Sequence, residues 1–400
     1  MERTTDDGAD RAADGEGDAT AGDRRTRSRR DVLVAGGAGL ATAVAGCTGR
    51  TGTTAKTSTG QQTTPATTEE PNDKAEFRLH WQRYSNLYAN VTASEHWTWP
   101  AHDVDVTVKP SNGSQAAAKS VASGKEMFGS GGYGAVLGLI GSGAPLTVVA
   151  NFTGPWGGVV SLEETGITSW TDLEGKTVGQ FPFGSTPVVA KAAMRRRGVD
   201  LSTIQFQNVQ PGSAISLLIQ GNLDAIIRYV PQTRARLGIE GYSVNALKSG
   251  AVLDHLGLAL FAHDDVVDRD PDLVNDVVAG FIDGLRFWAT NHDEVMARQK
   301  EIVKDSRWQP KLNDRLLGSV YAAQAPPKDV GLEQGKGWVD EDRLEKTIEV
   351  FHDAGALDTA MDPQTVYTNR FVEQNRDLAV DAAKALYAKL ESFEEGPNAL

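Results

Sequence analysis

Cysteine, positive charge and long apolar runs are all scarce in this sequence. A single cysteine, Cys47, occurs in 400 residues, which excludes a disulfide scaffold, a Cys-rich zinc site and an iron–sulfur cluster. Lys and Arg total 40 against 53 Asp and Glu, so the net charge of −13 argues against a nucleic-acid partner. Apolar residues make up 40% of the chain, enough to bury a core, which argues against a disordered protein. The length predicts two or three lobes of ordinary size.

The amino-terminal region has the features of an export signal in the expected order. Arg29 and Arg30 precede an uncharged, largely apolar stretch from Val32 to Ala45. Paired arginines before such a stretch are typical of a twin-arginine signal, and the stretch is shorter than the roughly 20 apolar residues that span a bilayer. Val44-Ala45-Gly46-Cys47 is similar to a lipobox, in which the cysteine becomes the lipidated first residue. The alternative is a chance arginine pair and an ordinary buried cysteine.

We therefore expect residues 1–46 to be a signal peptide and residues 47–75, rich in Thr, Gly and Ser, to be a flexible linker. The folded body would hang from the extracellular face of the membrane by the lipid on Cys47. The acidic balance and the excess of arginine over lysine suit a salt-loving archaeon. Sequons at Asn90, Asn112 and Asn151 are compatible with surface glycosylation, and we expect at most one to be occupied.

From residue 76 onward, short apolar runs alternate with helical patterns, which predicts an α/β protein with mostly parallel sheets. We expect two Rossmann-like lobes, residues 76–158 plus 262–400 and residues 159–261, with a ligand cleft between them and helices at the carboxyl terminus. The chain would cross near Val159-Val160 and return through Leu256 to Phe261. Each lobe would point helix N-termini, with their free N–H groups, at the cleft.

Particular segments support this alternation. Strands are expected at residues 77–81, 104–108, 127–128, 146–151, 177–180, 204–209, 225–229 and 242–247. Gly129 to Gly132 is expected to be a turn before an apolar helix at 133–140. Ser185 or Thr186 would cap a helix with Pro187 in its first turn, and Asp270-Pro271 would open a long helix through Trp288.

The chain resembles the solute-binding proteins of ABC importers, in the branch that binds nitrate, sulfonates, taurine and pyrimidine precursors of thiamine. The resemblance rests on five stretches: Leu79-His80-Trp81, the segment from Ser123 to Ser130, the Asp172-Leu173-Glu174-Gly175-Lys176 stretch, the segment from Gln220 to Ala225, and the helix that begins at Asp270-Pro271. It covers residues 76 to 300 and implies the type II periplasmic-binding-protein fold. Glu126 stands where the family more often has Asp, and the aromatic segment from Gln82 to Pro100 lacks the family's glycine-rich turn.

The first lobe supplies five candidate ligand contacts. Trp81, at the carboxyl end of strand one, could stack on a planar ligand, or it could be a core or hinge tryptophan. Ser130 and Tyr133 lie at the expected strand-to-helix turn, where Ser130 could also simply cap the helix. Asn151, and Trp156 in the glycine-rich loop that follows it, adjoin the crossing and could reach a ligand from the hinge side. Packing on the lobe surface is the alternative for Trp156.

In the second lobe and the crossings, the candidates are Ser185, Thr186 and Arg228. Ser185 and Thr186 would face the cleft from a helix N-terminus, with pure N-capping as the alternative. Arg228 could pair with a carboxylate or sulfonate, or form a surface salt bridge. His255, near the return crossing, is interpreted as structural or solvent-facing.

The resemblance implies a monomeric receptor that captures a small solute, closes its lobes and delivers the solute to an ABC permease and its ATPase. It implies no catalytic residue, cofactor, metal or nucleic acid. Two alternatives remain: a pyrimidine synthase that shares the fold, whose cysteine-rich iron motif this chain lacks, and a tethered sensor. Trp81, Tyr133 and Trp156 favour a planar heteroaromatic ligand, such as a pyrimidine precursor or a flavin, whereas hydroxyl and N–H groups favour an oxyanion such as nitrate, a sulfonate or taurine.

Overall fold

A computed structural model describes residues 73–83, 88–182, 184–303 and 308–393. The expected twin-arginine signal with Arg29 and Arg30, the expected lipidation site Cys47 and most of the expected linker lie outside the described residues. The linker was expected to reach residue 75, but residues 73–75 are already part of the first strand, because each pairs in register with the neighbouring strand β2.

The first sheet has the strand order β2-β1-β3-β10-β4. β1 pairs in parallel with β2 and β3, whereas β10 is antiparallel to both of its neighbours. The strand bounds are β1 Asp73–Leu79, β2 Val104–Pro110, β3 Phe128–Gly132, β4 Leu146–Thr153 and β10 Leu258–His263.

The second sheet has the order β7-β6-β8-β5-β9, in which β5 is antiparallel to β8 and β9 while β6 is parallel to β7 and β8. Its strands are β5 Gly157–Leu162, β6 Thr177–Gln180, β7 Gln205–Asn208, β8 Ala225–Tyr229 and β9 Val244–Lys248. The sequence expectation of an α/β protein with two lobes is confirmed, and both sheets are mixed rather than wholly parallel.

Sheet pairing places the crossings a few residues away from the sequence expectation. Expected to begin at residue 159, the second lobe has its first strand from Gly157. The expected return through Leu256 to Phe261 is wrong, because Leu258 to Phe261 belong to β10 and pair with β3 and β4 of the first sheet.

The glycine-rich segment from Gly129 to Gly132 is strand rather than turn. β3 is a central strand between β1 and β10, and this placement gives its backbone groups partners on both sides. The ring of Phe261 on β10 lies so close that an added Cβ at Gly129 would be 2.9 Å from it, and one at Gly131 would be 3.3 Å away. Glycine is therefore used here for close packing in a strand, not for a turn.

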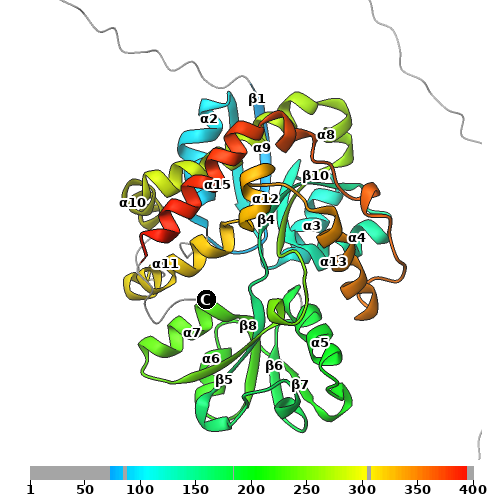
Figure 1. Ribbon diagram of the computed structural model, residues 1–400, viewed down its shortest axis with the longest axis vertical. Coiled ribbons are helices and arrows are strands. Elements are labelled where there is room, and N and C mark those ends of the chain that lie inside the picture. The colour runs from blue at the N-terminus through cyan, green and yellow to red at the C-terminus, as the bar shows by residue number, and fades with distance from the viewer. Residues whose placement is uncertain (1–72, 84–87, 183, 304–307, 394–400) are drawn as a thin grey trace, which may run out of the picture. The chain divides into compact units, whose positions relative to one another are not determined.

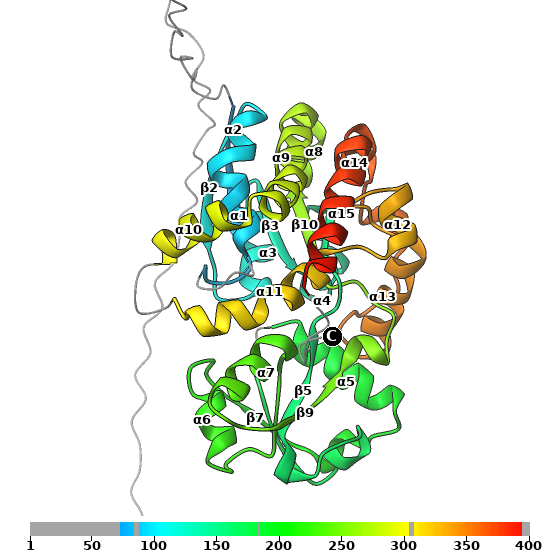
Figure 2. The same ribbon diagram turned by 60° about the vertical axis from the view of Figure 1, so that its left-hand side comes forward.

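Helices surround each sheet, as Figures 1 and 2 show. Those before the second lobe are α1 Ala89–Ala93, a π-helical turn η2 Ser94–Thr98, α2 Trp99–Ala101, α3 Ser114–Ala122 and α4 Tyr133–Gly141. Those of the second lobe are α5 Thr186–Arg196, α6 Ala214–Ile219 and α7 Val230–Ile239. After the return come α8 Asp264–Arg269, α9 Pro271–Thr290, α10 His292–Val303, α11 Pro310–Gln324, α12 Lys328–Glu333, α13 Glu341–Asp353, α14 Arg370–Gln374 and α15 Arg376–Glu391. Short 3-10 turns complete the set: η3 Glu163–Thr165, η4 Thr171–Leu173, η5 Leu201–Thr203, η6 Ser249–Ala251 and η8 Pro363–Thr365.

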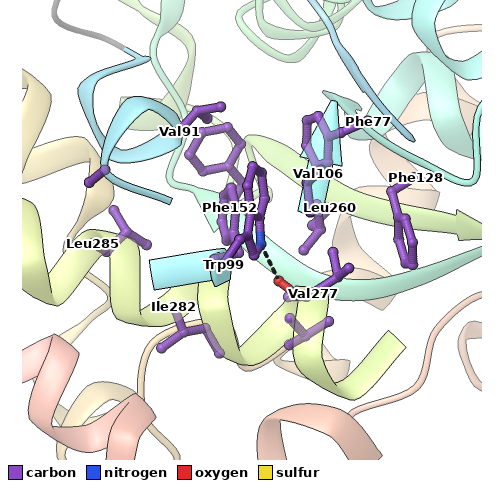
Figure 3. Packing of buried hydrophobic residues seen from close by; sticks show 14 of the residues in the cluster. Phe77, Val91, Trp99, Val106, Phe128, Phe152, Leu260, Val277, Ile282 and Leu285 are labelled. Atoms are coloured by element: carbon purple, nitrogen blue, oxygen red, sulfur yellow. Dashed lines mark hydrogen bonds between the residues drawn. The ribbon is translucent and has the colours of Figure 1, made fainter. Parts of the chain in front are cut away.

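The aromatic segment before β2 packs on the long helix α9. The Asp270 side chain caps α9 by accepting a hydrogen bond from the Leu273 N–H, so the expected helix start is confirmed. Trp99 is fully buried and donates its indole N–H to the Val277 carbonyl at 2.9 Å, inside a cluster with Phe77 (Figure 3). This packing also buries Asn90 completely, so its sequon cannot be a surface glycosylation site in the folded protein.

Two helices from the carboxyl-terminal part of the chain reach the second lobe. α11 packs against α7, and α13 packs against α5, as both ribbon views show. Arg195 on α5 donates to the Ala354 carbonyl just after α13, at 3.1 Å. The carboxyl-terminal helices therefore belong to the first lobe and also contact the second.

Candidate functional site

A cavity of about 200 Å³ lies where the chain crosses between the two sheets. Both lobes line it, as do both crossing segments, Thr153 to Gly157 and His255 to Leu258. Seven aromatic side chains contribute to the lining: Trp81, Tyr88, Tyr133, Trp156, Phe181, Tyr229 and Phe351. An apolar, aromatic cavity with a few polar groups, set between two lobes, is typical of a small-molecule site.

Six of the residues expected from the sequence line this cavity: Trp81, Tyr133, Trp156, Ser185, Thr186 and Arg228. Trp81 follows the last residue of β1 by two positions, and Tyr133 begins α4. Trp156 precedes β5 and stacks on Tyr229, with 4.6 Å between ring centroids, so the two rings form one wall.

Ser130 lies outside the cavity lining, which corrects its expected place at a turn. It is fully buried within β3, and its Oγ accepts the backbone N–H of His80 at 3.3 Å and lies 2.9 Å from His80 Nδ1. Its contact is therefore with His80, which does line the cavity. The expectation failed because β3 continues through Gly132, so Ser130 lies within the strand and not at its end.

Asn151 is likewise not part of the lining. It lies within β4, its backbone N–H donates to the Gly337 carbonyl at 2.6 Å, and its half-buried side chain leaves Oδ1 without a partner among the described residues. The cavity is reached only at the end of this strand, by Thr153 and Gly154. The sequon at Asn151 is thus on β4, an edge strand of the first sheet.

Ser185 contacts the first lobe, whereas the close contact of Thr186 lies within the second lobe. Ser185 precedes α5 but makes no side-chain capping bond, so pure N-capping does not explain it. Instead it lies against Gly132 at the end of β3, where an added Cβ would overlap Ser185 Oγ and Cβ. Within the second lobe, Thr186 Cγ2 would be 2.7 Å from an added Cβ at Gly157. The contact between Ser185 and Gly132 shows that the two lobes meet beside the cavity.

Arg228 gives the lining its charge. Its guanidinium lies over the Phe181 ring at 5.3 Å, a cation–π distance. Among the described residues that line the cavity, none is Asp or Glu, and Arg228 is the one Lys or Arg. A strongly cationic ligand would therefore find no carboxylate partner here, whereas a neutral or anionic ligand meets no electrostatic penalty.

His80, Tyr88 and Phe181 line the cavity but were not singled out from the sequence. Tyr88 Oη lies 3.2 Å from His80 Nε2, and Ser130 holds the other side of the ring. Burial lowers the pKa of His80 to about 3, so the ring is neutral at physiological pH. Strand-end position was the available signal for His80, since it adjoins Trp81; Tyr88 had none, because it comes from a segment that departs from the family pattern.

Several polar atoms of the lining have no hydrogen-bond partner within the part of the chain that the structure describes. They are Tyr133 Oη, Trp156 Nε1, Tyr229 Oη and His255 Nε2. Burial raises the pKa of both tyrosines above the ordinary value, so both hydroxyls keep their protons. Each buried, unpaired group costs about 1–3 kcal/mol, and a ligand in the cavity would recover that cost.

The described residues contain no cluster of three His, Cys, Asp or Glu side chains arranged to hold a metal ion. None of their helices combines the length and the apolar character that crossing a bilayer requires.

Comparison with known families and structures defines the class. The family model described as NMT1/THI5 like matches residues 92–295, and the chain belongs to this family. The riboflavin-binding protein RibY of Chloroflexus aurantiacus is 23% identical over 211 residues, which cover 52% of this chain and 58% of RibY. A putative binding protein of Brucella abortus is 23% identical over 289 residues, 71% of this chain and 87% of the relative.

Solved structures establish the fold. The alkanesulfonate-binding protein SsuA of Xanthomonas axonopodis pv. citri, bound to MOPS, superposes with a TM-score of 0.58 at 14% identity, over 74% of this chain and 99% of that one. The aliphatic sulphonate binding protein SsuA of Escherichia coli gives 0.58 at 16% identity, over 74% and 97%. The chain thus has the two-lobed type II periplasmic-binding-protein fold. Because one fold can host unrelated functions, the fold alone does not decide between binding and catalysis.

Proposed function

We propose that this chain is the solute-binding component of an ABC importer and that its solute is a planar heteroaromatic molecule. One observation carries the proposal: the cavity between the lobes is lined by seven aromatic side chains and by no carboxylate. Flat rings bury a large apolar area against such walls and stack on them in preferred geometries. Binding without bond making explains the role of two lobes, since closure reports to the permease that the receptor is loaded.

The riboflavin binding of RibY supports this ligand class, although that alignment spans little more than half of RibY. Flavins and thiamine pyrimidines share a flat ring system whose edge carries hydrogen-bonding atoms. Trp81, Tyr133 and the Trp156–Tyr229 wall are the residues that we assign to the ring faces. Ser185 and Thr186, at the start of α5, are assigned to a polar substituent of the ligand.

A sulfonate or another oxyanion is the second candidate, and Arg228 is the observation that favours it. The guanidinium lines the cavity together with the N-terminus of α5, and both attract anions. The binding of alkanesulfonate by SsuA proteins, which share only the fold, points the same way. We place this candidate second because one cation among seven aromatic rings suits an anionic substituent on a flat ligand better than a small inorganic anion.

We further propose that the receptor is exported by the twin-arginine route through Arg29 and Arg30 and anchored outside the cell by lipid on Cys47. The second lobe would begin with β5 at Gly157, and the first lobe would resume with β10 at Leu258. The expected partners are an ABC permease and its ATPase, and the receptor is expected to act as a monomer.

Calorimetric titration of the body from residue 73 onward tests the function and its ligand class together. Riboflavin, 4-amino-5-hydroxymethyl-2-methylpyrimidine, hexanesulfonate and nitrate are titrated separately. Heterocycle binding that is lost in Trp156→Leu but kept in Tyr242→Leu supports the proposal, because Tyr242 is a surface tyrosine outside the lining. If only the anions bind, a sulfonate or another oxyanion is the ligand class. If a bound compound is converted to product, the protein is an enzyme and not a binding protein.

A further inference from the structure

The side chain of His255 has a hydrogen-bonding state that the structure determines. His255 is 4% exposed, lies in the return crossing before β10 and lines the cavity. Its Nδ1 lies 2.8 Å from the Leu256 carbonyl oxygen. A carbonyl only accepts hydrogen bonds, so Nδ1 carries the hydrogen.

The other ring nitrogen is therefore an acceptor. Burial, the dominant influence, lowers the pKa of His255, so the ring is neutral and Nε2 carries a lone pair. Nε2 is buried and has no partner among the described residues. Neither the described residues nor bulk water supplies a hydrogen-bond donor for this lone pair.

Trp156 imposes the opposite requirement on the same cavity. Its indole Nε1 is also buried without a partner in the described chain, and an indole N–H only donates. The unpaired hydroxyls of Tyr133 and Tyr229 can follow either role. The complement of this cavity is therefore a ligand with at least one acceptor, for Trp156, and at least one donor, for His255.

From this pattern we infer that His255 is a ligand-binding residue that accepts a hydrogen bond from a ring N–H or ring amino group of the solute, while Trp156 donates to a ring nitrogen or carbonyl. The inference rests on the proposed function and narrows it to heterocycles with a lactam, imide or aminopyrimidine edge. Ionised sulfonate and nitrate groups carry acceptors only. An ammonium group, as in taurine, would supply donors, but the lining has no carboxylate to balance its charge.

The test compares ligands that differ by one hydrogen-bond donor. Riboflavin is paired with 3-methylriboflavin, and 4-amino-5-hydroxymethyl-2-methylpyrimidine with its N,N-dimethyl derivative. Calorimetry gives the affinity ratio within each pair for the parent chain, His255→Leu, His255→Gln and the control His352→Leu, a surface position on α13. In the parent, the methylated member of a pair should bind about 10- to 100-fold more weakly than the unmethylated member.

His255→Leu separates the hydrogen bond from a steric clash. Leucine keeps an apolar side chain in the same place but accepts no hydrogen bond, so the affinity ratio should fall to about 1. A clash with the added methyl would keep the ratio high. His255→Gln, whose Oε1 accepts, should restore part of the ratio, and His352→Leu should leave it at the parent value. Thermal melting of each variant without ligand verifies that it folds.

The outcomes distinguish this inference from the proposed function. If a heterocycle binds but the ratio is the same in the parent and in His255→Leu, the inference is wrong while the function stands. If no heterocycle binds and hexanesulfonate or nitrate does, both the inference and the proposed ligand class are overturned. If none of these compounds binds, the proposed ligand class fails and the inference fails with it.

Discussion

One methyl group at Gly132 should make closure of the two lobes less favourable. This residue ends β3 with φ −64° and ψ 138°, a conformation open to alanine, so Gly132→Ala introduces no backbone strain. Within the first lobe, the nearest atom to an added Cβ is Ser114 Oγ at 3.6 Å, an ordinary contact. Ser185 Cβ, from the second lobe, would be only 2.6 Å away. The substitution is therefore tolerated when the lobes are apart and penalised when they close.

The size of the effect follows from the cost of overpacking. Inserting a methylene into a tightly packed contact costs about 1–3 kcal/mol, which corresponds to a 5- to 150-fold increase in Kd if only the closed, ligand-bound state bears it. Because a ligand shifts an equilibrium only by its differential affinity for the two states, the cost appears in binding. Calorimetric titration measures the Kd, and melting without ligand measures the stability of the fold.

Gly138→Ala serves as the matched control, and Ser185→Gly serves as the rescue of Gly132→Ala. Gly138→Ala, in the middle of α4, adds a methyl 3.6 Å from the nearest atom and should leave binding unchanged. Ser185→Gly removes the overlapping atoms, so it should restore the affinity of Gly132→Ala beyond what the two single changes predict by addition. Parent-like affinity for Gly132→Ala, or an affinity loss with no rescue, would show that the lobes do not meet here in the bound state.

Three further outcomes are expected. Cys47→Ala should release the exported protein from membranes into the medium, and continued membrane association on fractionation would refute the lipid anchor. Trp81→Ala should weaken ligand binding at least about tenfold through lost ring contact, whereas Tyr242→Ala should not; equal affinities would remove Trp81 from the site. Lys336, buried with its ammonium on the Phe152 carbonyl, has a pKa lowered by burial from 10.5 to about 7. Between pH 7 and pH 10.5 the lysine is protonated in the unfolded chain but neutral in the folded protein. The destabilisation of the fold by the buried Lys336 is therefore fully present below pH 7 and decreases as the pH rises. Lys336→Met should therefore stabilise the fold by a few kcal/mol at pH 6 and by less at pH 9 in urea unfolding, and a pH-independent difference would contradict this.

Turn and capping residues made some elements predictable from the sequence. The strand at Thr177 to Gln180 was located correctly because Gly175 closes a turn directly before it, with φ +74°. Asp270 with Pro271 gave the start of α9 for the same kind of reason, since a cap and a first-turn proline act over a few residues. Elements fixed by distant partners were missed: β3 contains four glycines or serines in a row, and it is a strand only because β1 and β10 pair with it.

Site residues, too, were predictable where local position places them and missed where distant pairing decides. Trp81, Trp156 and Arg228 were found because strand ends and crossings are where an open α/β fold brings side chains to its cleft. Ser130 was assigned to the ligand by the same rule and lies instead beneath His80, since the rule depends on where the strand ends. Because the strand end was predicted four residues too early, Ser130 was assigned to the ligand although it contacts His80.

His255 shows why the polarity of a cavity is the hardest property to predict. A single histidine in a loop has no periodicity and no motif, so a structural role is the reasonable expectation. What assigns it to the ligand is a pair of facts about one ring: Nδ1 is occupied by the adjacent carbonyl, and Nε2 is buried with no described partner. The first is a contact between neighbouring residues, but the second depends on the tertiary packing around the return crossing. The sequence of such a protein therefore indicates that a solute binds, while the hydrogen bonds its cavity leaves unmade indicate which chemical groups that solute must carry.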